Sequence, residues 1–210
     1  MRKLTKWVLI ILGCILSVIG FIVISFIVEM TPDKDKEEKV KAKAEEYIES
    51  EFSGQMEIFD TLYDNMGNFN GFEYAAKVEN KDTDVQFLVY EQESSGAMAD
   101  DYAVSFYEKT LHDLIIDDIE KMFDHPEMVT VDYEQTKIAR KYIGETDIPD
   151  IRELNVSPSL VIWMDRGRES ADEEKTKELI EILKKEKKIP HVGLKVDYIN
   201  MGGENIVKNY

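Results

Sequence analysis

Cysteine is nearly absent from this sequence, and histidine is rare. Cys14 is the single cysteine, so no disulfide can form within the chain, and the residues after the apolar segment around Cys14 contain no thiol nucleophile. His112, His125 and His191 are the only imidazoles available as general bases, and none lies in a catalytic motif. The sequence also lacks GxSxG, HExxH, CxxC and phosphate-binding glycine loops. We therefore predict a protein that is not an enzyme and that uses no cofactor.

Charged side chains are missing from residues 7–28, which read WVLIILGCILSVIGFIVISFIV. A helix of this length rises about 1.5 Å per residue and covers the roughly 30 Å hydrocarbon core of a bilayer. The flank at residues 1–6 carries only basic charge, from Arg2, Lys3 and Lys6. Because basic flanks stay in the cytoplasm, we expect a single-pass protein of the cell membrane with a cytoplasmic N-terminus and an extracytoplasmic C-terminal domain.

Cys14 supplies an alternative to an uncut helix. The letters ILGC resemble the site at which bacterial lipoproteins are cut and lipidated on the cysteine. The apolar run before Cys14 is short for a signal core, however, and the apolar run continues for 14 residues after it. A cleavable secretory signal is no better supported, since no small-x-small site closes the run before Glu29. We predict an uncut anchor and keep Cys14 as the candidate lipidation site of the alternative.

Positive charge is scarce after the span. All 43 acidic residues follow residue 28 but three of the 26 basic ones precede it, which leaves a formal charge of −20 on residues 29–210. Binding of nucleic acid requires a basic surface, so we exclude nucleic acid as a partner. With 43% hydrophobic residues overall the chain can build a core. We expect a folded domain at 55–210, with a potential internal boundary near 135–157.

A charged stalk is predicted between the span and the domain, at residues 29–54. Its pattern is helical, with Thr31 as the expected N-cap, Pro32 in the first turn and Gly54 as the stop. Apolar residues recur at three- and four-residue steps in its second half. We expect that half to dock on the domain.

The domain is predicted to contain both strands and helices. Residues 72–78 and 85–91 predict a hairpin with an exposed edge, and the run 56–67 is ambiguous between a strand and a short helix. A long amphipathic helix is expected to open at SSGAMADDY and to end at His125-Pro126. The second half predicts a strand at 128–134, a short helix or turn at 147–154, a strand at 159–165, a helix at 176–188, a strand at 193–199 and a loop-like tail.

These elements predict an α+β fold, in which a single transmembrane helix is followed by a helix and a mixed or antiparallel sheet with packed helices. The run 159–165 is apolar throughout, which places Trp163 and Met164 in the core of a central strand. A capping box at Ser170 and Glu173 is expected to start the next helix. Strand–helix–strand occurs twice, and the letters VDY end both units, so two related units are an alternative.

Carboxylates on the long helix form the one candidate metal site. Asp113, Asp117, Glu120 and Asp124 are spaced by four, three and four residues and share one helix face. Hard cations such as Ca²⁺ take several carboxylate oxygens at one place. No loop with calcium-site spacing follows, so we prefer a solvated face opposite the apolar stripe and predict no metal.

Asp100-Asp101-Tyr102 allows two interpretations. The carboxylates could mark a site at the edge of the sheet, but acidic residues also favour the positive end of a helix, and we prefer a helix start. The aromatic residues of the hairpin are equally open to two interpretations. They could line a groove or divide between a core face and a half-buried outer face, which we prefer: Phe72, Tyr74, Phe87 and Tyr90.

The layout of the first part of the chain is familiar. It consists of MRKLTKW, the uncut span, KAEEYIESEF, a hairpin that ends in FLVYE, and DDY before a helix. Over roughly residues 1–110 this layout resembles small membrane-anchored proteins of Firmicutes that are grouped as domains of unknown function. Lysine outnumbers arginine by 21 to 5, which fits a low-GC Gram-positive bacterium. The resemblance implies a membrane anchor and supplies no catalytic residues.

We predict a non-enzymatic function, in which the tethered domain binds a protein or peptide partner at the cell envelope. The tether, the acidic surface, the exposed hairpin edge that could accept a strand and the missing catalytic residues favour this hypothesis. An enzyme with a carboxylate-only site is the main alternative, and a cleft with two converging carboxylates of raised pKa would favour it. An immunity or regulatory protein that acts on a membrane partner through the span is the third hypothesis.

Overall fold

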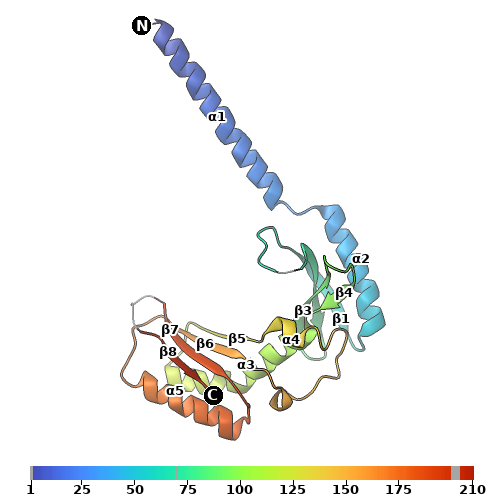
Figure 1. Cartoon of the computed structure of the whole chain (residues 1–210), viewed down its shortest axis with the longest axis vertical. Coiled ribbons are helices and arrows are strands. Elements are labelled where there is room, and N and C mark those ends of the chain that lie inside the picture. The colour runs from blue at the N-terminus through green and yellow to red at the C-terminus, as the bar shows by residue number, and fades with distance from the viewer. Residues whose placement is uncertain (1, 70, 200–203) are drawn as a thin grey trace.

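The computed structural model describes residues 2–69, 71–199 and 204–210 (Figure 1). The chain has the predicted α+β fold, with two four-stranded sheets. In chain order the elements are α1 (Arg2–Met30), α2 (Lys34–Glu51), β1 (Met56–Tyr63), β2 (Tyr74–Asn80), β3 (Val85–Glu91), β4 (Met98–Asp100), α3 (Tyr102–Phe123), β5 (Met128–Asp132), α4 (Gln135–Ile138), a 3-10 turn (Ile151–Glu153), β6 (Ser159–Met164), α5 (Asp172–Glu181), a π-helical turn (Ile182–Glu186), β7 (Gly193–Tyr198) and β8 (Ile206–Asn209).

Helix α1 extends away from the rest of the molecule (Figure 1). Within the described part of the chain it supplies the one apolar stretch that is long enough to cross a membrane, and none of that stretch is buried. Cys14 lies exposed on this helix, with apolar residues on both sides of it in the chain. By length and composition, α1 supports a single-pass membrane protein.

Helix α2 begins two residues after the position that its sequence predicts. Asp33 is the N-cap, and its carboxylate accepts a hydrogen bond from the backbone N–H of Asp35 at 2.9 Å. The expected cap, Thr31, is wrong, because its hydroxyl instead donates to the Ile27 carbonyl at 2.7 Å and so completes the end of α1. Gly54 follows α2 with a φ of 107°, as a stop residue requires.

The first sheet, called sheet A, has the order β1-β2-β3-β4 and is antiparallel throughout. The predicted hairpin is present as β2 and β3, and Met56–Tyr63 of the ambiguous run 56–67 form strand β1. The expectation of an exposed hairpin edge is wrong, since β1 pairs with β2 and β4 pairs with β3. Residues 98–100 were expected in the long helix, but they pair with Val89–Glu91 as β4.

The second sheet, called sheet B, has the order β5-β6-β7-β8. As predicted, β6 is an inner strand; it runs antiparallel to β5 and parallel to β7, with α5 as the crossover. Within the tail predicted to be loop-like, Ile206–Asn209 form β8 against β7, and residues 200–203 lie outside the described residues. The capping box before α5 is absent, because the N-cap residue is Ala171 and makes no side-chain cap hydrogen bond.

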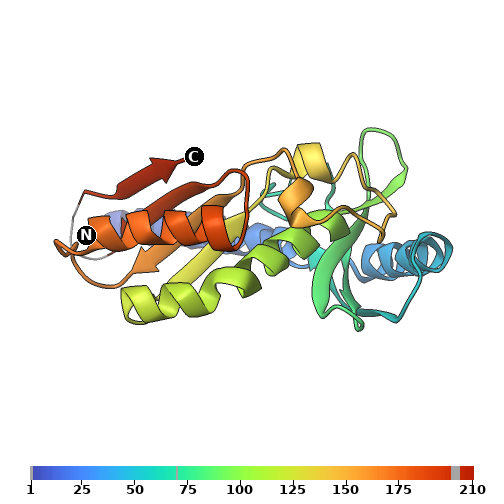
Figure 2. The ribbon, with the colours of Figure 1, turned by 90° about the horizontal axis from the view of Figure 1, so that it is seen from below.

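Helix α3 connects the two sheets and contributes to both cores. Its Tyr102 joins the core between α2 and sheet A, whereas Leu111, Ile115 and Phe123 pack against sheet B. Figure 2 shows α3 and α5 lying together across one face of sheet B. Because β3 and β5 lie in different sheets, only β6-α5-β7 is a strand–helix–strand unit, and the two halves have different topologies. The potential boundary at 135–157 lies between β5 and β6 of one sheet.

Candidate binding cleft beside sheet A

A cleft of about 750 Å³ opens beside sheet A, within the volume range of small-molecule and peptide sites. Three parts of the chain form it: the loop between β1 and β2, the ends of β3 and β4, and the segment after α4. We call it the aromatic cleft. It is lined by Asn68, Phe69, Gly71, Tyr90, Gln92, Ser94, Asp100, Asp101, Ala139, Arg140 and Ile143.

One wall of the aromatic cleft is a stack of three rings. The ring centroids of Phe69 and Phe72 are 5.3 Å apart, and those of Phe72 and Tyr90 are 4.3 Å apart. Phe72 is buried, whereas Phe69 and Tyr90 are half-buried and present ring surface to the cleft. Stacked rings fix one another, so this wall is a preformed surface for an apolar or aromatic group.

The loop that carries Phe69 is shaped by Asp64. The Asp64 carboxylate accepts hydrogen bonds from the backbone N–H groups of Phe69 at 2.6 Å and Asn68 at 2.9 Å. The bond from Phe69 is the main reason why the pKa of Asp64 lies below its ordinary value. The position of the ring at the mouth of the cleft is therefore set by a charged, hydrogen-bonded turn.

Asp100 joins the walls of the cleft. It is 1% exposed, and its carboxylate accepts three hydrogen bonds, from the Tyr102 N–H at 2.9 Å, the Gly144 N–H at 2.8 Å and the Tyr47 hydroxyl at 2.7 Å. Burial raises the pKa of Asp100. Since both carboxylate oxygens accept bonds from the protein, Asp100 acts as a structural junction between α2, α3 and the segment after α4.

Asp101 is the N-cap residue of α3, which agrees with the preferred interpretation of a helix start. Its side chain makes no cap bond to the helix, however, and accepts a hydrogen bond from the Leu88 N–H of β3 at 2.6 Å. Burial raises the pKa of Asp101 to about 6. The pair of aspartates thus lies both at the helix start and at the edge of sheet A.

The segment after α4 closes the cleft with Ala139, Arg140 and Ile143. The side chain of Ile143 is 37% exposed although it is large and apolar. Arg140 is exposed and forms no ion pair with any residue that the structure describes. This wall therefore offers an apolar contact beside a guanidinium that is available to a carboxylate.

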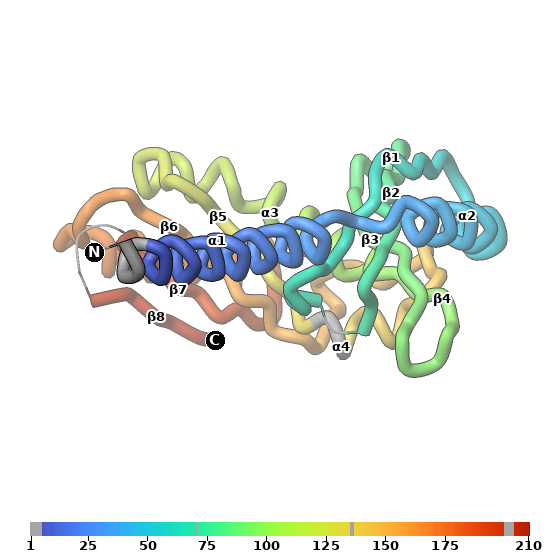
Figure 3. Tube along the Cα trace, turned by 90° about the horizontal axis from the view of Figure 1, so that it is seen from above, coloured from blue at the N-terminus to red at the C-terminus, as the bar shows by residue number. Residues whose placement is uncertain are grey.

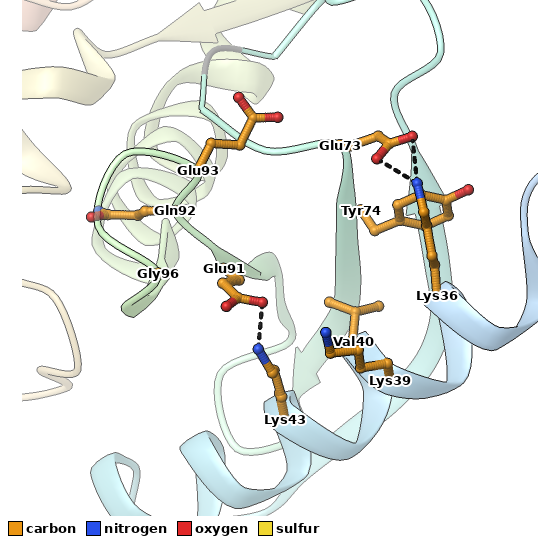
Figure 4. A pocket seen from close by; sticks show the side chains of 10 residues that line it. All are labelled: Lys36, Lys39, Val40, Lys43, Glu73, Tyr74, Glu91, Gln92, Glu93 and Gly96. Atoms are coloured by element: carbon orange, nitrogen blue, oxygen red, sulfur yellow. Dashed lines mark hydrogen bonds and ion pairs between the residues drawn. The ribbon is translucent and has the colours of Figure 1, made fainter.

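A second, smaller groove of about 300 Å³ lies between α2 and sheet A (Figure 4). Figure 4 shows Lys36 of α2 reaching Glu73, at 2.9 Å, and Lys43 reaching Glu91. These ion pairs satisfy two of the three lysines that line the groove. We interpret it as a charged seam along the contact between α2 and the sheet and not as a ligand site. Exposed ion pairs of this kind contribute little individually to stability.

The acidic residues predicted on the long helix lie together on the exposed face of α3: Asp113, Asp117, Glu120 and Asp124. Asp113 pairs with Lys109 at 2.5 Å, and Asp124 forms the C-cap with a φ of 54°. In the described part of the chain no group of three or more histidine, cysteine, aspartate or glutamate residues is placed to hold a metal ion.

Of the hairpin aromatics, Phe87 belongs to the core, Tyr74 is half-buried, and Phe72 and Tyr90 join the stack at the cleft. Sequence reasoning missed the cleft, because its residues come from segments far apart in the chain. The adjacent pair Asp100-Asp101 was its one local signal. Comparison with known protein families, curated proteins and solved structures finds no match to this chain.

Proposed function

We propose that the chain is a membrane-tethered, extracytoplasmic binding protein whose aromatic cleft takes up a segment of a protein or peptide partner at the cell envelope. The observation that carries this proposal is the composition of the cleft wall. Half-buried rings of Phe69 and Tyr90 line the cleft together with an exposed Ile143, and Arg140, which also lines it, lacks an ion pair within the described residues. Aromatic residues and arginine are the side chains that most often dominate recognition surfaces.

The chemistry of the cleft specifies a class of ligand. The stack of rings suits an aromatic or long apolar side chain, and the guanidinium of Arg140 suits a neighbouring carboxylate. A partner segment with an apolar or aromatic residue next to an acidic residue, or next to a C-terminal carboxylate, fits both walls. The helix α1 would hold the cleft close to partners in or near the membrane, which raises their effective concentration.

An enzyme with a carboxylate-only site is the second candidate, because Asp100 and Asp101 both line the cleft and both have a raised pKa. Asp100 is poorly suited to proton transfer, since the protein already donates three hydrogen bonds to it. Asp101 alone would then have to supply the chemistry. Binding without chemistry is the simpler reading of this arrangement.

Site-specific photocrosslinking in the native cell tests the proposal. A benzoylphenylalanine at Ile143 should label a discrete partner, and the same group at the exposed Glu178 of α5 should not label it. Arg140→Glu and Tyr90→Ala should each abolish labelling at 143. Equal labelling at both positions, or labelling that survives both substitutions, would contradict the proposal. Chemical conversion of the labelled partner that is lost in Asp101→Asn would favour the enzyme.

A further inference from the structure

Sheet B has one face covered by helices and one face without them. Leu160, Ile162 and Met164 of β6 point into the core beneath α3 and α5. Side chains alternate along a strand, so Val161 and Trp163 point to the opposite face. The expectation that Trp163 is a core residue is therefore wrong, whereas Met164 is buried as predicted. The continuous apolar run reflects a strand that is apolar on both faces although helices cover only one.

Large apolar side chains gather on the uncovered face, which we call the free face. Met128 lies opposite Trp163 in the sheet register and is 49% exposed. Val207 in β8 is 59% exposed, and Ile199, directly after β7, is 48% exposed. The indole N–H of Trp163 donates to the Thr130 hydroxyl at 3.4 Å. Exposed apolar groups that cluster in this way mark an interaction surface.

The charged groups at the centre of the free face neutralise each other. Lys195 and Asp197 are two residues apart in β7 and form an ion pair. The Lys195 ammonium also lies 5.8 Å from the centroid of the Trp163 ring. Asp132 at the end of β5 is exposed, at the margin of the face. The free face is therefore mainly apolar, and the two opposite charges at its centre form an ion pair. It differs in this from the strongly acidic remainder of the chain.

The free face points to the side from which α1 extends. Figure 2, from below, shows α3 and α5 in front of the strands of sheet B, whereas Figure 3, from above, shows α1 passing over β6 and β7. The exit of α1 is tied to sheet A, because the Tyr63 hydroxyl donates to the Glu29 carbonyl at 2.9 Å and the Asp33 N–H donates to the Tyr74 hydroxyl at 2.9 Å. These two hydrogen bonds hold the junction between α1 and α2 on sheet A.

We infer that the free face of sheet B lies against the surface of the lipid bilayer that α1 crosses. Tryptophan is enriched at the membrane interface, and a lysine such as Lys195 can keep its ammonium among the headgroups while its stem contacts apolar atoms. The tether holds the face beside the bilayer, so little apolar area is needed for contact. Because the chain is acidic, the contact is apolar and does not depend on anionic lipids.

Fluorescence quenching of the full chain in phosphatidylcholine vesicles tests this inference. Trp7 and Trp163 are the only tryptophans, so Trp7→Phe leaves Trp163 as the single reporter. Phosphatidylcholine that is brominated near the headgroup end of its acyl chains serves as the quencher. The matched control combines Trp7→Phe and Trp163→Phe with Glu178→Trp, which places the reporter on the exposed side of α5. The test holds for either orientation of the chain, since the domain always meets the leaflet from which α1 emerges.

We expect the loss of Trp163 emission to be several-fold larger than the loss for the control, and to persist in high salt. Met128→Glu should reduce this loss. Equal quenching of the two reporters would overturn the inference. The inference would also be overturned if Trp163 were shielded from aqueous acrylamide but not quenched by brominated lipid. That result would mean that a second copy of the chain or another protein covers the free face. The readout does not depend on any ligand of the aromatic cleft.

Discussion

The hydroxyl of Tyr47 in α2 donates a 2.7 Å hydrogen bond to the carboxylate of Asp100 at the end of β4. Through Asp100, helix α2 of the stalk is connected to the start of α3 and to Gly144, which follows α4. One buried carboxylate thus sets the relative positions of the stalk helix, sheet A and a wall of the aromatic cleft. The first prediction concerns this junction.

Asp100→Ala should lower the free energy of unfolding by about 3 kcal/mol, because it leaves the buried N–H of Tyr102 and the part-buried donors of Tyr47 and Gly144 without an acceptor. Tyr47→Phe removes one donor and leaves the other two bonds in place, so it should cost about 1 kcal/mol. Thermal unfolding of the full chain in detergent, followed by near-UV circular dichroism, measures both. Equal stabilities of Asp100→Ala and the wild type would show that the junction is not structural.

The ion pair between Arg166 and Asp172 leads to the second prediction. Asp172 is fully buried, and Arg166 contacts both of its oxygens at 2.8 Å. Arg166→Leu should lower the free energy of unfolding by about 3 kcal/mol, because the buried carboxylate loses its two-pronged partner. It would keep only the hydrogen bonds from the Tyr198 hydroxyl and the Glu169 N–H and a Lys175 ammonium at 3.9 Å. Arg168→Leu is the matched control. Its partner Glu173 is part-exposed, so the cost should be below about 1 kcal/mol. Similar costs for both variants would contradict the account.

Stability should increase on mild acidification, which is the third prediction. Burial raises the pKa of Asp101 to about 6 and that of Glu108 to about 7, so the folded state binds more protons than the unfolded chain. The two protonated carboxyl groups contribute fully to the free energy of unfolding below their ordinary pKa values, 3.8 for Asp101 and 4.5 for Glu108. This contribution is lost as pH rises through the raised pKa values, about 6 and about 7. The free energy of unfolding should therefore be larger at pH 5 than at pH 7.

The combination of Asp101→Asn with Glu108→Gln should flatten this dependence. Asp172 acts in the opposite direction at lower pH. Burial opposes ionisation there, but the hydrogen bonds led by that of Arg166 hold the pKa of Asp172 at about 2. Its contribution is lost as pH falls from about 4 to about 2. Chemical denaturation between about pH 2 and 8 measures both limbs. A stability that rises from pH 5 to 7 would contradict the assignment.

The fourth prediction concerns Cys14, which lies exposed in α1 with apolar residues on both sides. If α1 is an uncut anchor, Cys14→Ser should leave the amount of membrane-bound protein and the mass of the chain otherwise unchanged. Membrane fractionation followed by mass spectrometry of the intact chain measures both. Loss of the substituted chain from the membrane, or accumulation of an unprocessed form, would support lipidation.

Local signals in the sequence predicted much of the fold, because strong periodicity and helix stops act within a few residues. The β2–β3 hairpin, the long helix ending before His125-Pro126, and the inner strand β6 follow from such signals. β4 and β8 were missed, since each is short and is defined by the strand it pairs with. Trp163 was misplaced because the sequence of β6 does not reveal that helices cover one face of sheet B alone.

The aromatic cleft could not be predicted, for a related reason. Phe69, Tyr90 and Ile143 come together only after sheet A has formed and the segment after α4 has docked on Asp100. The sequence shows an acidic pair and scattered aromatic residues, but it does not show that these residues lie around one cleft. Tertiary contacts over such separations carry no local pattern.

The central claim is that an uncut α1 tethers an outward-facing domain, and protease treatment of intact cells tests it most directly. The C-terminus carries a tag, and the N-terminal fragment is identified by mass. We predict loss of the tag together with an unmodified N-terminal fragment that stays in the membrane. A tag that remains protected would place the domain in the cytoplasm, and a diacylated fragment beginning at Cys14 would show that the helix is cut. Either result would contradict the account.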